Sequence, residues 1–119
     1  MSIAPTAIAF TAYPVTDMTR SVAFYGETLG LPQVGHAMEY WTEFEVGGMT
    51  FGVGTFEQIG KAGTAQSLAL EVPDIAAYRE RLKAAGFEST EPTETPVCFI
   101  SMVTDPDGNK IIVHQAKPH

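Results

Sequence analysis

The sequence has few of the features that mark several large protein classes. It has one cysteine, Cys98, and seven basic residues against fourteen acidic ones, so its formal net charge is −7. A single cysteine cannot form an intramolecular disulfide, which fits a reducing compartment, and we expect a cytoplasmic protein. The N-terminus has no basic segment ahead of an apolar one, so no secretory signal is expected.

Basic clusters and long apolar runs are also missing. Binding to phosphate backbones requires clustered Lys and Arg, so nucleic acid and anionic membranes are not expected as partners. No apolar run reaches the ~18 residues that a membrane-spanning helix needs. The acidic charge could favour a cationic ligand through its summed field, although solubility alone would also explain it.

What the chain does contain indicates one globular domain over residues 1–119. Its hydrophobic content is 45% and its charged content is 18%, which are ordinary values for a folded domain. A chain of this length buries about two thirds of the surface that it exposes when unfolded. A packed core is therefore expected.

Two parts of the chain share one plan. An apolar strand at residues 7–15 leads through Val-x-Asp to Asp17, and a second strand at residues 66–72 leads the same way to Asp74. Both aspartates are predicted helix N-caps, because their carboxylates can accept hydrogen bonds from the first helical turn. Apolar residues then recur at helical spacing, and a glycine ends each predicted helix. The helical positions are Met18, Val22, Tyr25 and Leu29 in the first half and Ile75, Tyr78, Leu82 and Ala85 in the second, with Gly30 and Gly86 as the stops.

Each predicted helix is followed by three extended segments. A Gly-Gly turn joins two of them in the first half, and residues 56–65 form a loop between the halves. This order predicts an α+β fold of two βαβββ modules, at about 5–56 and 65–116, with curved mixed sheets around a central cavity and helices outside. The extended segments are 33–37, 39–46 and 49–55 in the first half and 88–95, 97–104 and 110–115 in the second.

Strand alternation predicts which side chains face that cavity. Successive side chains of a strand point to opposite faces, and the apolar set should meet the helix. The other set is left as the predicted ligand-binding set, namely Phe10, Trp41, Glu43, Gly52, Ser67, Glu71, Ile112 and His114.

Some of these positions carry chemistry. The flat face of Trp41 would suit an aromatic or cationic ligand, and packing in the core or in a dimer interface is an equal alternative. Gly52 leaves room for a ligand or for close backbone approach, or else marks a bulge. His114 could form an acid–base pair with Glu43 or Glu71, and these three are the candidate catalytic residues. The alternative is that they are solvated at the rim.

The two strand-Val-x-Asp-helix units, the stretch from Phe24 to Leu31 and the turn Asp105-Pro106-Asp107-Gly108-Asn109 together resemble the vicinal oxygen chelate superfamily. This superfamily includes glyoxalase I, extradiol dioxygenases and bleomycin-resistance proteins. The resemblance implies a homodimer. It also implies metal ligands at four positions, where the present residues offer no good donor for a divalent ion. No metal cofactor is therefore expected, and the four positions are Phe10, Gly52, Ser67 and Ile112.

These observations favour a metal-free protein that binds a small aromatic or cationic molecule. The alternative is an enzyme of the same superfamily, of lyase, isomerase or dioxygenase type. It would use His114 with Glu43 or Glu71 as acid and base or as displaced metal ligands. We expect Cys98 to be a buried structural residue, because no positive neighbour would activate its thiol. His36 and His119 are expected to be solvated.

Overall fold

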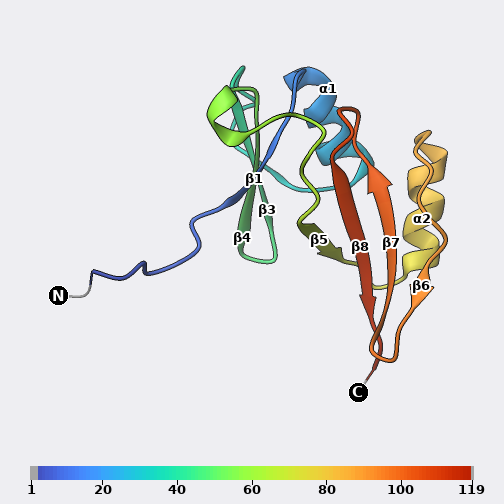
Figure 1. Cartoon of the computed structure of the whole chain (residues 1–119). Helices are drawn as coiled ribbons and strands as arrows, with labels where there is room; N and C mark the ends of the chain where they lie inside the picture. Colours follow the sequence, from blue (N-terminus) through green and yellow to red (C-terminus); the bar gives the residue numbers. More distant parts are fainter. Residues whose placement is uncertain (1–2, 119) are drawn as a thin grey trace.

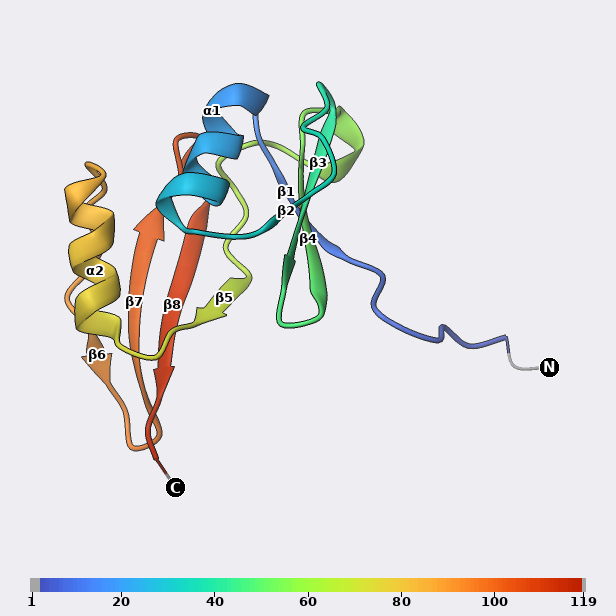
Figure 2. The same cartoon turned by 180° about the vertical axis from the view of Figure 1, so that it is seen from behind.

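The computed structural model describes residues 3–118, which form two four-stranded sheets and a layer of short helices (Figures 1 and 2). The first sheet contains β1 (Thr11–Pro14), β2 (Gln33–Val34), β3 (Trp41–Val46) and β4 (Met49–Gly54). The second contains β5 (Leu68–Glu71), β6 (Thr93–Glu94), β7 (Cys98–Thr104) and β8 (Lys110–Ala116). The helical elements are α1 (Met18–Val22), the π-helix η1 (Ala23–Thr28), the 3-10 helix η2 (Glu57–Ile59) and α2 (Ile75–Ala84).

The two sheets have the same topology. Their strand orders are β1-β4-β3-β2 and β5-β8-β7-β6, and in each sheet the first pair is parallel while the others are antiparallel. The predicted α+β fold with two βαβββ modules and mixed sheets is thus confirmed. Within residues 3–118 no strand pair joins the two sheets, so they do not close around a cavity. The expected closed arrangement is wrong because the modules are joined through their helices and turns instead.

Several strands begin later than expected, most clearly β1, whereas β2, β4 and β8 begin at the predicted residues. The predicted strand covered residues 7–15, whereas β1 starts at Thr11, whose partner Phe51 lies near the start of β4. In this parallel pair β4 begins only two residues before Phe51, at Met49, so it offers few partners ahead of Thr11, and residues 3–10 are all exposed. Apart from Phe10, whose ring packs against Trp41, they run away from both sheets (Figures 1 and 2).

The helices begin as predicted. Asp17 Oδ1 accepts a hydrogen bond of 3.0 Å from the backbone N–H of Arg20, and Asp74 Oδ1 accepts one of 3.0 Å from that of Ala77. These contacts satisfy donors that have no partner within the helix. None of the helices in residues 3–118 is long and apolar enough to cross a membrane.

One apolar core serves both modules. Its members come from both sheets, η1 and α2, and the rings of Phe24 and Phe87 from opposite halves lie 4.7 Å apart. The core therefore covers one face of each sheet, and we call the other face the open face. Alternation had predicted this division for β3, β4, β5 and β8. Fully or almost fully buried core side chains include Tyr13, Phe24, Tyr25, Phe44, Val53, Leu82, Val103, Ile111 and Val113.

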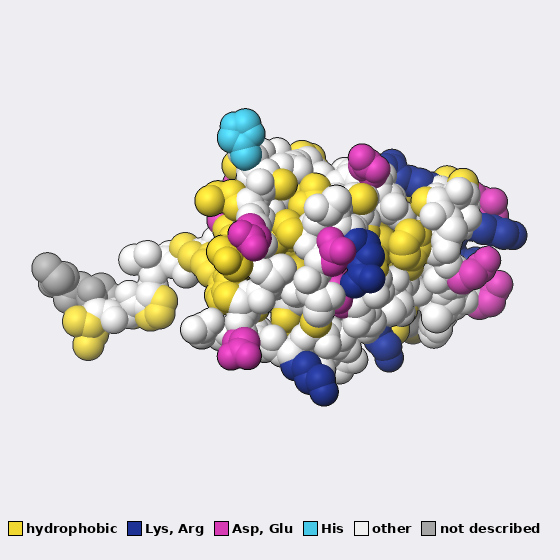
Figure 3. Space-filling view, turned by 90° about the horizontal axis from the view of Figure 1, so that it is seen from above, with side chains coloured by type: hydrophobic (Ala, Val, Ile, Leu, Met, Phe, Trp, Pro, Cys, Tyr) yellow, Lys and Arg dark blue, Asp and Glu magenta, His cyan; other side chains and the backbone are white. Residues whose placement is uncertain are grey.

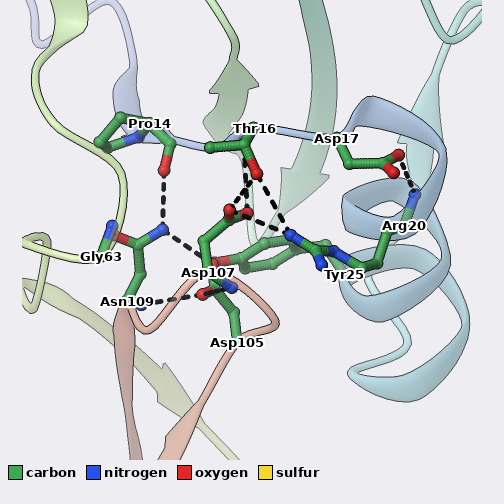
Figure 4. A network of polar contacts seen from close by, with 9 residues as sticks. All are labelled: Pro14, Thr16, Asp17, Arg20, Tyr25, Gly63, Asp105, Asp107 and Asn109. Atoms are coloured by element: carbon green, nitrogen blue, oxygen red, sulfur yellow. Dashed lines mark hydrogen bonds and ion pairs between the residues drawn. The ribbon is translucent and has the colours of Figure 1, made fainter.

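The turn at residues 105–109 joins the modules through polar contacts (Figure 4). Asp105 is buried, and its carboxylate accepts hydrogen bonds from the Tyr25 hydroxyl at 2.7 Å and the Asn109 side-chain amide at 2.8 Å. The same amide of Asn109 donates to the carbonyl of Pro14 at 2.8 Å, and its Oδ1 accepts from the backbone N–H groups of Gly63 and Ala65. This turn is thus hydrogen-bonded to β1, to η1 and to the segment between the modules.

Candidate functional site

Trp41 lies on the open face of the first sheet, against the backbone of two glycines. A Cβ atom added at Gly52 would overlap Cζ2 of Trp41, and one added at Gly54 would lie 3.1 Å from its Cε3. The strand pairing of β3 with β4 is continuous here, so there is no bulge. The space that glycine leaves at position 52 is therefore taken by the indole of Trp41.

Three further side chains hold the indole in place. The ring of Phe10 lies 5.2 Å away in an edge contact, and that of Phe56 lies 6.0 Å away. The indole N–H of Trp41 donates a hydrogen bond of 2.8 Å to Glu43 Oε2. We call Phe10, Trp41, Glu43 and Phe56 the aromatic platform. Trp41 remains partly exposed and is no member of the apolar core, so core packing is the wrong interpretation of this residue.

The second sheet carries a different pair on its open face. His114 Nδ1 hydrogen-bonds Glu71 Oε1, and the backbone N–H of Ala116 donates to Glu71 Oε2 at 2.8 Å. The hydrogen bond from the Ala116 amide lowers the pKa of the Glu71 carboxyl below its ordinary value, and the contact with His114 lowers it to a smaller extent. Of the two partners predicted for His114, Glu71 is therefore the one in contact, and Glu43 instead binds Trp41 on the other sheet.

The four positions with no metal donor divide between the two sheets. Phe10 and Gly52 belong to the first module, while Ser67 lies exposed just before β5 and Ile112 is partly exposed on β8. Because the sheets are not closed, these positions do not surround one enclosed cavity within the chain. Phenyl, glycine and aliphatic groups do not fit a divalent ion, and a serine hydroxyl is a poor ligand for it.

The remaining candidates give no nucleophile or metal cluster. In the part of the chain that the structure describes, no three His, Cys, Asp or Glu residues are placed to hold a metal ion. Cys98 is only 5% exposed and its Sγ lies 3.1 Å from Thr95 Oγ1, as expected for a structural cysteine. His36 is exposed as predicted, and His119 lies outside the described residues.

A separate concavity lies beside α1 on the helix side of the first sheet. Its walls are built from some of the side chains within residues 16–27 and 31–39, together with Thr55, and its volume is about 910 Å³. We call it the α1 groove. None of the eight predicted ligand-binding residues lines it. Met18 and Val22, which recur at helical spacing in the sequence, are both only partly buried and line this groove.

Comparisons with known proteins agree with the fold. A sequence profile of the Glyoxalase/Bleomycin resistance protein/Dioxygenase superfamily matches residues 7–113. No curated protein matches the chain.

Several solved structures superimpose over nearly the whole chain. TnmS3, an antibiotic binding protein from Streptomyces sp. CB03234, has a TM-score of 0.83 and 25% identity, over 98% of this chain and 100% of its own. A glyoxalase/bleomycin resistance protein from the same Streptomyces strain has a TM-score of 0.77 and 27% identity, over 92% of this chain and 100% of its own. Lactoylglutathione lyase from Agrobacterium tumefaciens, with a TM-score of 0.77 over 94% of this chain and 95% of its own, is 20% identical and shares the fold.

Proposed function

Because the chain belongs to the Glyoxalase/Bleomycin resistance protein/Dioxygenase superfamily, we propose that it is a binding protein of that superfamily. Its ligand is a small aromatic or cationic molecule held on the aromatic platform, and binding needs no metal ion.

The position of Trp41 carries this proposal. Gly52 and Gly54 let the indole lie against the sheet, and Phe10 and Phe56 flank it. A ring fixed in this way offers a flat surface at little cost in conformational entropy, which suits stacking with another aromatic system. The partly exposed indole is thus a preorganised surface for a ligand.

Glu43 supports a preference for a positive charge. Its carboxylate is tied to the indole N–H through Oε2, beside the ring that would receive the ligand. A cation next to this carboxylate gains a charge-assisted contact as well as attraction to the indole face. The net charge of −7 favours the approach of the same ligands.

The family context and the donor set support the rest of the proposal. TnmS3 is named as an antibiotic binding protein, which favours a small molecule as the ligand of this chain too. The residues at positions 10, 52, 67 and 112 are Phe, Gly, Ser and Ile, and they do not fit a metal. We therefore assign no step to a metal.

Calorimetric titration with 9-aminoacridine, a planar aromatic cation, tests the proposal, and 9-anthracenecarboxylate serves as a planar anion of similar size. We expect saturable binding of the cation that persists in a chelator. Trp41→Ala should weaken binding of the cation roughly tenfold or more. Glu43→Gln should weaken binding of the cation and leave binding of the anion unaffected.

Tyr40→Leu is the matched control, because it removes an exposed aromatic side chain next to Trp41 that is not part of the platform. Equal effects of Tyr40→Leu and Trp41→Ala would contradict the proposal. So would stoichiometric metal in the purified protein together with binding that is lost in the chelator.

The contact of His114 with Glu71 favours a second candidate, an enzyme that transfers protons. A carboxylate that is itself held by the Ala116 amide can orient the imidazole, as in known base–orienter pairs. Turnover of a ligand found by titration, persisting in chelator and abolished by His114→Ala, would favour this candidate. Binding without turnover would oppose it.

We also propose a homodimer in the cytoplasm. The exposed apolar side chains of Ile3 and Ile8 lie on the segment that runs away from the chain's own sheets. Such side chains are suited to an interface with a second copy. Light scattering of the full chain should give twice the 12.8 kDa monomer mass. Removal of residues 2–9 should shift the protein toward the monomer, and a monomeric full chain would refute the dimer.

A further inference from the structure

We propose that the α1 groove is a second ligand site, for a small amphiphilic cation with one protonated amine on an apolar body. The groove contains none of the residues of the aromatic platform, so this site does not depend on the function proposed above.

The dimensions of the groove suit a small molecule. Its volume of about 910 Å³ lies within the range of roughly 300–1,000 Å³ that is usual for ligand pockets. Ala23 and Gly26, on η1, are small residues among those that line it. They leave little side chain on this part of the helical wall.

Its apolar surface is adaptable. Met18, Val22, Leu31 and Met38 line the groove, and Met38 is 65% exposed. The sulfur of Met18 accepts a hydrogen bond of 3.2 Å from the Thr42 hydroxyl, so this methionine has a defined position on the helical wall. Methionine side chains pack against apolar ligands of varied shape. An alkyl chain or a ring would remove these surfaces from water.

The charges of the groove are all of one sign. Glu27 and Glu39 are its only charged lining residues, and no Lys or Arg is among them. Arg81 lies nearby, yet its guanidinium donates to the backbone carbonyls of Glu27 and Thr28, both at 3.0 Å. Within residues 3–118, neither carboxylate forms an ion pair. Two unpaired carboxylates beside apolar side chains complement an apolar molecule with a positive end and disfavour one with a negative end.

Seen from above, the molecule shows acidic, basic and apolar side chains interspersed on one face (Figure 3).

The chain contains its own reporters for an experiment. Met18 and Met38 line the groove, whereas Met49 lies on β4 at the hairpin and Met102 lies on β7. The methyl groups of all four can be labelled with carbon-13 and followed by NMR in the full chain. The probes are n-octylamine, n-octanoate and n-octanol at sub-micellar concentration, because they share one chain and differ in charge.

We expect octylammonium to shift the methyl signals of Met18 and Met38 saturably, and to leave those of Met49 and Met102 unchanged. Octanoate and octanol should bind more weakly. The double variant Glu27→Gln and Glu39→Gln should weaken octylammonium binding roughly three- to tenfold and leave octanol unaffected. Added salt should have the same selective effect, since the carboxylates are exposed.

The double variant Glu80→Gln and Glu88→Gln is the matched control, because it removes the same charge from exposed positions outside the groove. If both double variants weaken octylammonium binding equally, the effect comes from net charge and the proposed site in the α1 groove is refuted. The proposal is also overturned if the three probes bind alike, or if the methyl group of Met49 or Met102 responds in place of Met18 and Met38. Trp41→Ala should leave all these shifts intact, which separates this site from the aromatic platform.

Discussion

The hydroxyl of Tyr25, on η1 in the first module, donates a hydrogen bond of 2.7 Å to the carboxylate of Asp105, which follows β7 in the second. Both side chains are buried, and burial together with the adjacent carboxylate raises the pKa of the Tyr25 hydroxyl above its ordinary value. The raised pKa favours the neutral hydroxyl, which is the form that donates this hydrogen bond. The contact is one of the direct polar links between the two modules.

Tyr25→Phe should lower the free energy of unfolding by about 1–2 kcal/mol, because Asp105 then loses one of its buried donors. The loss is limited, since Asn109 still donates to the same carboxylate. Urea unfolding measures the effect. Tyr40→Phe is the control, since Tyr40 is exposed, and it should change the stability by less than about 0.5 kcal/mol. A similar loss in both variants would argue against a special role for the Tyr25 hydroxyl.

Asn109→Ala should lower the free energy of unfolding further than Tyr25→Phe does, by about 3 kcal/mol or more. The substitution leaves the carbonyl of Pro14 and the N–H groups of Gly63 and Ala65 without their partner. Buried groups that lose a hydrogen bond carry most of the cost of such changes. Hydrogen exchange should show faster exchange of the Gly63 and Ala65 amides in the variant. Unchanged protection of these amides would refute the assigned role.

Gly52→Ala should displace the indole of Trp41, because the added Cβ would overlap its ring. We expect a loss of about 1–3 kcal/mol in stability and a changed tryptophan fluorescence spectrum. In a Trp41→Ala background, Gly52→Ala should change the stability little, because the ring that the new Cβ would overlap is absent. A double-mutant cycle measures this coupling, and purely additive effects of the two substitutions would contradict the contact.

The Glu71 carboxyl should titrate below its ordinary pKa of 4.5, because the Ala116 amide and His114 stabilise its charged form. A carboxyl with a lowered pKa in the folded state stabilises the protein above its unfolded pKa, and this stabilisation is lost as the pH falls through the folded value. Carbon-13 NMR of the carboxyl group gives the midpoint directly. Ala116→Pro, which removes the amide donor, should raise the midpoint further than His114→Gln does. A midpoint that neither variant changes would show that these contacts are absent in solution.

Local patterns in the sequence were sufficient for the order of elements and for the buried face of most strands. Leu70 and Val72 alternate with Ala69 and Glu71, Ile111 and Val113 lie two residues apart on one strand, and all four are buried as alternation requires. The start of β1 could not be predicted in the same way. It depends on where the parallel partner strand β4 begins, and the apolar residues before Thr11 look the same in sequence whether or not they are paired.

The site was predicted only in part, because its contacts join distant segments. Trp41 and Gly52 were both chosen as cavity residues, yet nothing in their spacing showed that one fills the space left by the other. The partner of His114 depended on which sheet each glutamate occupies. The α1 groove escaped prediction because the exposure of Met18 and Val22 is set by the path of residues 31–39, which helical spacing does not describe.

The contact of Trp41 with Gly52 also has a meaning for the history of the family. A side chain at position 52, including one that could bind a metal, would need the space that the indole occupies. An ancestor with a ligand there could acquire tryptophan at position 41 only after losing that ligand, and a descendant could regain the ligand only after losing the tryptophan. The two residues should therefore covary among relatives, with tryptophan at the first position accompanied by glycine at the second.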